Sequence, residues 1–210
     1  MNMASAVLNE YLAPGYTELS EVDIPDLRSE FEQAEHWLAN HFLNSVLRGR
    51  YREGARHLAL AYLRRTSGAF DAYHRARKLT LEFLDLRKAG KQPVRGYYVM
   101  IDAWESCFLQ AGMAVDLFRA MIDGEKLFEK NDGSAQERAY TIANQIKHAA
   151  SCVASGHVTK TDTVSLIVQN RGLSSYAVAI TFHELAEILR DFSRVADRLQ
   201  DPLSFVSASS

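Results

Sequence analysis

YYVMIDAWESCFLQAGMAVDLF, residues 97–118, determines the architecture, because apolar side chains surround its helical axis almost completely. A helix on the surface carries one apolar stripe, whereas a helix that is apolar nearly all round lies among other elements. We therefore predict a central buried helix over about 96–122. Asp102 and Glu105 share one face of this helix. Three roles are open for these two carboxylates. They pair with a basic neighbouring helix, face a solvated groove or form a carboxylate site.

Four further helices are predicted around this one, from the helical spacing of their apolar residues and from signals at their ends. The first opens at Asp23-Ile-Pro-Asp, with proline in its first turn. The last opens at Thr181-Phe-His-Glu184, which has the pattern of a capping box. The predicted ranges are about 23–47, 50–88, 133–156 and 182–199. The apolar stripe predicted for the first helix consists of Leu27, Phe31, Ala34, Leu38, Phe42 and Val46.

A short β segment is predicted between the fourth and fifth helices. Thr163–Gln169 and Leu173–Ile180 are rich in β-branched or small residues, and Asn170-Arg-Gly between them has the composition of a turn. The predicted fold class is all-α, a bundle of about five helices with a small β-hairpin insert before the last helix. The predicted parts are an N-terminal arm over 1–22, the bundle over 23–200 with its β insert at about 160–180, and a frayed tail over 201–210.

Composition narrows the class of protein. The chain has 210 residues, 47% of them hydrophobic, which is enough to bury the core of one domain. It has no run of about 18 apolar residues, so no membrane span is expected. The N-terminus lacks the basic region of a signal peptide, which predicts a cytoplasmic protein. Cys107 and Cys152 fall among apolar residues of predicted helices and are expected to be reduced core thiols.

Charge is distributed unevenly along the chain. Residues 48–95 carry thirteen Lys or Arg against four acids, whereas residues 1–47 carry eight acids and one Arg. Arginine favours bidentate contacts with phosphate or carboxylate groups. The basic block, which includes Arg64 and Arg65, therefore fits two partners, either nucleic acid or the protein's own acidic first helix.

Familiar catalytic and cofactor motifs are missing from the sequence. His183-Glu-Leu-Ala-Glu187 lacks the second histidine of the zinc-protease helix motif. No Glu-x-x-His pair is present, although di-iron bundles need two. Phosphate-binding loops and nucleophile elbows are also absent. We therefore predict no metal and no cofactor. The scattered histidines are expected in structural or exposed positions: His36, His41, His57, His74 and His157.

Residues 137–155, ERAYTIANQIKHAASCVAS, hold the cluster best suited to chemistry. On a continuous helix this segment has two opposed faces. Asn144 and His148 share the polar face, four residues apart, and that face is either solvated or the wall of a cleft. The apolar face consists of Ala139, Ile142, Ala143, Ile146, Ala149, Ala150 and Val153. The polar face consists of Glu137, Thr141, Asn144, His148, Ser151 and Ser155.

The chain resembles the HEPN superfamily through three segments that cover roughly residues 95–200: the central helix, Arg138 followed by Asn144-Gln-Ile-Lys-His148, and the closing helix TFHELAEILRDFSRVADRL. This resemblance implies an all-helical bundle from a prokaryotic toxin, phage-defence or RNA-cleaving system. It also implies a homodimer, since active HEPN ribonucleases bring two Arg…His helices together in a metal-independent site. There His transfers protons and Arg stabilises the developing phosphate charge.

The sequence departs from the pattern of the active ribonucleases in the spacing of Arg and His. Nine residues separate Arg138 from His148, where the family has four to six. On an ideal helix these two residues are about 15 Å apart along the axis. Asn144 can position a ligand or fix the imidazole tautomer, but it cannot replace a cation.

Two functions are therefore expected. One is a non-catalytic or regulatory HEPN-like protein that binds a protein or RNA partner through the polar face. The other is a metal-independent endoribonuclease in which His148 is the acid/base, Asn144 positions the substrate and Arg138 or Lys147 supplies charge. A cation could also come from the Arg-rich second helix. The predicted binding residues are Lys147, Thr141, Ser151, Arg64 and Arg65.

Overall fold

The computed structural model describes residues 15–32, 34–47, 55–122, 127–156 and 166–200. The predicted tail and most of the predicted arm lie outside these residues, as does the first part of the predicted β insert. In chain order the elements are α2 (Arg28–Phe31), α3 (Ala34–Phe42), the π-helix η2 (Leu43–Leu47), α4 (Ala55–Lys88), α5 (Val94–Met121), α6 (Ala135–Lys147), α7 (Ala149–Ala154), β1 (Ile167–Gln169), β2 (Gly172–Ser175), β3 (Val178–Thr181) and α8 (Phe182–Leu199). The fold is mostly α, with a small sheet before the last helix, as the sequence predicted.

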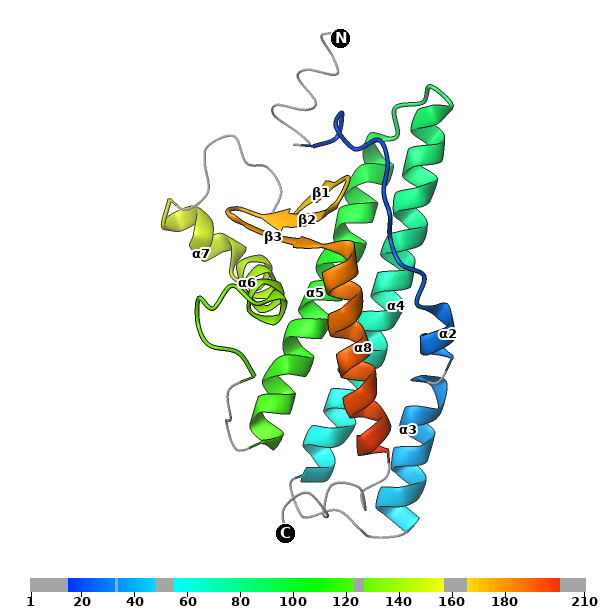
Figure 1. Ribbon diagram of the computed structural model, residues 1–210, viewed down its shortest axis with the longest axis vertical. Coiled ribbons are helices and arrows are strands. Elements are labelled where there is room, and N and C mark those ends of the chain that lie inside the picture. The colour runs from blue at the N-terminus through cyan, green and yellow to red at the C-terminus, as the bar shows by residue number, and fades with distance from the viewer. Residues whose placement is uncertain (1–14, 33, 48–54, 123–126, 157–165, 201–210) are drawn as a thin grey trace.

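The long helices α4 and α5 form the framework of the molecule. They pack against each other along most of their length and follow its long axis (Figure 1). The predicted central helix is confirmed as α5, whose residues Trp104 and Phe108 have no exposed surface. The Trp104 indole N–H donates to Thr80 Oγ1 on α4 at 3.0 Å, so the buried polar group is satisfied.

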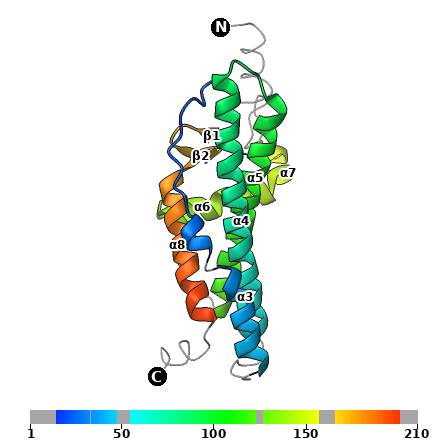
Figure 2. The ribbon, with the colours of Figure 1, turned by 90° about the vertical axis from the view of Figure 1, so that its right-hand side faces the viewer.

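Helix α8 closes the bundle beside α4, and α6 crosses α5 at a steep angle (Figures 1 and 2). The predicted capping box of α8 is present, because Thr181 Oγ1 accepts from the Glu184 N–H at 3.1 Å and Glu184 accepts from the Thr181 N–H at 2.9 Å. The predicted stripe of α8 is buried along its whole length: Leu185, Leu189, Phe192, Ala196 and Leu199.

The segment before α2 packs along α4 (Figure 2). Tyr16 is buried, and the Arg87 guanidinium of α4 donates to the Tyr16 carbonyl and lies 5.2 Å from the Tyr16 ring centroid. Arg77 of α4 lies 3.5 Å from the Asp26 carboxylate. Of the two partners considered for the basic block, the protein's own acidic N-terminal region is contacted by Arg77, whereas Arg87 contacts the backbone and the Tyr16 ring of the same region.

The predicted first helix is divided, and its predicted stripe is buried only in part, with Leu27 and Ala34 buried but Phe42 exposed. It consists of α2, α3 and η2, and Phe42 is 59% exposed. Trp37 and His41 are buried instead, and the Trp37 indole N–H donates to Asp197 on α8 at 2.7 Å. This partner makes burial of a polar aromatic side chain favourable, and sequence periodicity does not contain that information.

The predicted fourth helix is interrupted at His148, which ends α6 and precedes α7. Ser134 caps α6, with its Oγ accepting from the Glu137 N–H at 3.1 Å. The apolar face is buried only in α6, at Ala139, Ile142 and Ala143. In α7 no residue is buried, so the continuous face predicted through Val153 is wrong beyond the break.

The predicted hairpin has a third strand. The sheet is antiparallel with the order β1-β2-β3, and a second tight turn at Tyr176, with φ of 49°, joins β2 to β3. Gly172 in β2 has no room for a side chain, because an added Cβ would lie 2.0 Å from the Ile180 carbonyl oxygen. The third strand and the requirement for glycine at position 172 both arise from close packing of backbones. A pattern of residue propensities does not contain this information.

Candidate functional site

The polar face of α6 and α7 is only partly open to solvent. Lys147, His148 and Ser151 are exposed at the break between the two helices. Asn144 and Thr141, which lie one and two turns before His148, are half-buried. The Thr141 hydroxyl donates to Glu137 at 3.0 Å within α6. Exposure therefore increases from the middle of α6 toward α7, and the accessible part of this face is at the His148 end.

Arg138 is held in a structural network at the other end of α6. Its guanidinium donates to the Glu184 carboxylate of α8 at 2.6 Å and to the Ala179 carbonyl of β3 at 2.6 Å. A third bond, at 3.2 Å, goes to the Gly133 carbonyl before α6. Burial of the Glu184 carboxyl opposes ionisation, but hydrogen bonds from Thr181 and Arg138 outweigh it and lower the Glu184 pKa. Arg138 thus joins three elements, which corrects the expectation that it supplies charge to His148.

The Asn144 side chain interacts with Tyr140, one turn earlier in α6, rather than with the His148 side chain. Burial raises the Tyr140 pKa, a hydrogen bond to Asp116 raises it further, and a hydrogen bond with the Asn144 side chain lowers it. The Tyr140 hydroxyl donates to Asp116 of α5 at 2.6 Å. Asn144 therefore takes part in a polar contact between α6 and α5. Its link to His148 is through the backbone, where the His148 N–H donates to the Asn144 carbonyl at 2.9 Å.

Helix α7 is an exposed projection at the edge of the molecule (Figure 1). It has six residues, and Val153 is 63% exposed. The His148 carbonyl accepts from the Ser151 and Cys152 N–H groups, so the backbone of the break is hydrogen-bonded. Helix α7 is thus short, carries mostly small side chains and one larger apolar side chain, Val153, and is preceded by His148.

The two candidate arginines of the basic block do not join this face. Arg65 donates to Gln110 of α5 at 3.1 Å. Arg64 is exposed on α4, whereas α6 packs mainly on α5. The exposed face of α4 around Arg64 carries both signs of charge, with Asp71, Arg75, Lys78 and Glu82. A mixed face of this kind is a weaker match to nucleic acid than the basic stripe considered above.

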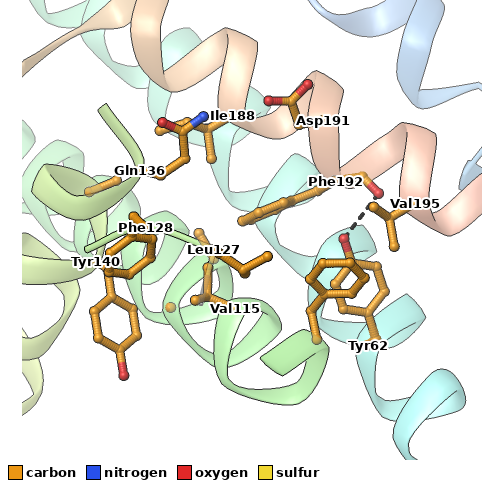
Figure 3. A pocket seen from close by; sticks show the side chains of 14 residues that line it. Tyr62, Val115, Leu127, Phe128, Gln136, Tyr140, Ile188, Asp191, Phe192 and Val195 are labelled. Carbon is orange, nitrogen blue, oxygen red and sulfur yellow. Dashed lines mark hydrogen bonds between the residues drawn. The ribbon is translucent and has the colours of Figure 1, made fainter. Parts of the chain in front are cut away.

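A cavity that the sequence did not reveal lies between α4, α5, α6 and α8 (Figure 3). Its volume is about 180 Å³ and its lining is mostly apolar and aromatic. Several lining residues, such as Tyr62, Ala139 and Phe192, were expected only to be members of apolar stripes. Periodicity predicts that such side chains are buried, but only the relative positions of four helices show that they leave a space. The lining residues are Tyr62, Ala111, Gly112, Val115, Phe118, Leu127, Phe128, Gln136, Ala139, Tyr140, Ile188, Asp191, Phe192 and Val195.

Other groups with potential chemistry do not assemble into a site in the described part of the chain. Burial raises the Glu105 pKa, and the nearby Asp102 carboxylate raises it further. Cys107 is fully buried and its thiol pKa is raised to about 12, as expected for an inert core thiol. Within the described ranges no group of His, Cys, Asp and Glu side chains is arranged to hold a metal ion. None of the described helices is long and apolar enough to cross a membrane.

Comparisons with protein-family models, with curated proteins and with solved structures give no match for this chain.

Proposed function

We propose that this protein is a non-catalytic, regulatory helical bundle of the HEPN type that binds a protein partner through α7 and the adjoining end of α6. The HEPN resemblance implies its setting, a prokaryotic defence or toxin-type system. The observation that carries the proposal is the position of Arg138. Its guanidinium is committed to Gly133, Ala179 and Glu184, while His148 is exposed at the far end of α6.

The arrangement around His148 argues against cleavage of RNA by a single chain. Metal-independent cleavage requires a proton-transfer group and a cation at the same phosphate. The neighbouring Lys147 is the exposed last residue of α6, and no hydrogen bond or ion pair among the described residues holds its ammonium group beside His148. Asn144 is engaged with Tyr140. The polar face therefore has an accessible histidine without the positioned cation that catalysis needs.

The exposure of α7 favours partner binding. Isolated helices shorter than about 12–15 residues are marginal in water, and most helices are stabilised by packing of an apolar face. Helix α7 has six residues and buries none of them. A partner that covers α7 would bury Val153 and provide this packing, and small neighbours such as Ala150 and Ser151 would permit close approach. His148 could then form a hydrogen bond across the interface.

A second copy of this chain is the partner that we propose for α7. The HEPN resemblance implies contact between equivalent helices of two subunits. A two-fold interface presents the same patch on both copies. Helix α7 is uncharged along its length, so the like charge that the two copies must keep apart is that of Lys147 at the end of α6. We expect a homodimer in which Val153 is buried.

The test of the non-catalytic assignment is incubation of the purified protein with mixed RNA in EDTA, in parallel with His148→Ala and Asn144→Ala. We expect all three proteins to leave the RNA intact. Metal-independent cleavage that is lost in His148→Ala would contradict the proposal and establish the ribonuclease alternative. Cleavage retained in both variants would indicate a contaminating nuclease, which repurification of His148→Ala would remove.

A further inference from the structure

The cavity between α4, α5, α6 and α8 has the character of a ligand site separate from α7. Figure 3 shows the rings of Tyr62 and Phe192 on one side and those of Phe128 and Tyr140 on the other, with Leu127 and Val115 between them. The side chains come from all four helices and from the segment before α6. A molecule bound here would contact each of the packed helices at once.

The polar atoms of the aromatic lining are already hydrogen-bonded. The Tyr62 hydroxyl donates to the Phe192 carbonyl at 3.2 Å, and the Tyr140 hydroxyl points away from the other rings and donates to Asp116. Burial raises the Tyr62 pKa above its usual range, so this phenol stays neutral. No Lys, Arg or His side chain is among the described lining residues. An anion would therefore lose its hydration in the cavity without a compensating cation.

The size of the cavity suits one ring. An engineered apolar cavity of about 150 Å³ in another protein stays dry and binds benzene, and the cavity here measures about 180 Å³. The Tyr62 ring centroid is 5.8 Å from that of Phe118 and 6.3 Å from that of Phe192, and the latter pair is edge-on. An additional ring can join such a cluster by offset or edge-to-face contact.

The mouth of the cavity is polar. Gln136 is exposed, and Leu127 beside it is 37% exposed, so the cavity opens to solvent at this side. The Gln136 amide has both donor and acceptor groups for a polar substituent. Asp191 lies at the rim, where it accepts from Arg194 and its charge is compensated. An apolar interior with a few polar groups at the entrance is the usual form of a small-molecule site.

We propose that this cavity binds a small, uncharged, single-ring aromatic molecule, with the ring among Tyr62, Phe118 and Phe192 and one neutral polar substituent directed toward Gln136. The ligand class follows from the volume, from the aromatic lining, from the lack of a cationic side chain among the described lining residues and from the pairing of Asp191 with Arg194. The site does not include α7, so it is independent of the proposed partner-binding surface.

The test is a titration of the full chain with phenol, followed by heteronuclear NMR, with benzoate as the charged comparison. We expect saturable shifts confined to signals of the lining residues with phenol, and at least about tenfold weaker binding of benzoate because of the cost of burying its charge. Equal binding of the two compounds, or shifts that spread over the surface and do not saturate, would overturn the proposal.

Two variants that fill the space make the test specific. Ala139→Leu adds bulk from α6, and Val195→Phe adds bulk from α8, so at least one folded variant is expected. Each should reduce phenol affinity at least about tenfold by occupying the cavity. Ala120→Leu, the same substitution at an exposed position of α5, should leave the affinity within about twofold. Unchanged affinity in a folded filling variant would place the phenol elsewhere and refute the site.

Discussion

Arg138 connects the segment before α6 to β3 and α8, and its replacement measures how much this connection stabilises the fold. Arg138→Met keeps the aliphatic stem but removes the donors to Ala179 and Glu184. Both members of the ion pair are partly exposed, so we expect a loss of only about 1–2 kcal/mol in the free energy of unfolding. Urea denaturation measures this loss of stability. Arg64→Met, at an exposed position of α4, is the control and should change stability by less than about 0.5 kcal/mol. Equal effects in the two variants would contradict the structural role.

Gly172 is required by the close approach of β2 and β3. A Cβ at this position would lie 2.0 Å from the Ile180 carbonyl oxygen, so Gly172→Ala must separate the strands. We expect this substitution to lower the free energy of unfolding by more than about 2 kcal/mol. In Gly96→Ala, at the start of α5, the nearest atom, Pro93 Cβ, is at 3.4 Å, and alanine is the better helix former. Thermal unfolding compares the stability of the two variants. A Gly172→Ala protein as stable as Gly96→Ala would contradict this account.

His41 is the residue whose burial gives stability a pH dependence near neutrality. It is 1% exposed, and its pKa is lowered mainly by burial, partly opposed by its contact with the Leu199 carbonyl. The unfolded chain binds a proton at the ordinary histidine pKa of about 6.5, whereas the folded protein resists protonation. Stability is therefore complete above that pH and is lost as the pH falls below it.

Unfolding measured at pH 7.5 and at pH 5 tests this linkage. We expect the wild type to lose stability over the interval, and His41→Asn to lose less. His74, whose pKa is also lowered by burial, contributes in the same direction and remains in the variant. The carboxylates with lowered pKa values, Asp26 and Glu184, lose their contribution only at lower pH. An identical loss in wild type and variant would show that His41 does not carry the dependence.

The capping box at Thr181 stabilises the first turn of helix α8. Its contribution to the free energy of unfolding can be measured separately from that of packing. Thr181→Ala removes the acceptor of the Glu184 N–H bond and is expected to cost about 1 kcal/mol, within a range of about 0.5–2 kcal/mol for such caps. Thr181→Ser keeps a hydroxyl and should retain most of the stability. Chemical denaturation of the three proteins provides the comparison, and an alanine variant as stable as the serine variant would show that the cap is dispensable.

The elements that were predicted correctly are those specified by local signals. The apolar circumference of α5, the stripe of α8 and its capping box all depend on residues within a few turns of one another, so the sequence contains them. The break at His148 has no glycine or proline to mark it. The burial of Trp37 depends on Asp197, which is 160 positions away in the chain. The third strand and the division of the first helix are likewise products of packing between distant segments.

The same distinction between local signals and long-range packing applies to the candidate site. That His148 lies outside the apolar face follows from helical spacing, and the exposed position of His148 agrees with it. The ion pair between Arg138 and Glu184 depends on the approach of α6 to β3 and α8, which no local pattern indicates. The aromatic cavity also depends on the mutual position of four helices. Helical spacing alone thus identified the polar face. It did not show which side chains of that face are exposed and which are held in contacts with other elements.

In the whole molecule, a stable framework of α4, α5 and α8 supports a peripheral helix, α7, with no buried residue. In this arrangement the long helices form the packed framework, and the surface that we propose for binding lies outside it. The central claim is that α7 binds a second copy of the chain.

Sedimentation equilibrium of the wild type and of Val153→Asp, at micromolar protein concentrations, tests that claim most directly. The account predicts a dimer for the wild type and a monomer for Val153→Asp, because a charge on the exposed apolar residue of α7 would be buried at the interface. Leu81→Asp, at an exposed apolar position of α4, which lies on the other side of the molecule from α7 (Figure 1), is the control and should remain dimeric. A monomeric wild type, or a Val153→Asp protein that dimerises as the wild type does, would contradict the account.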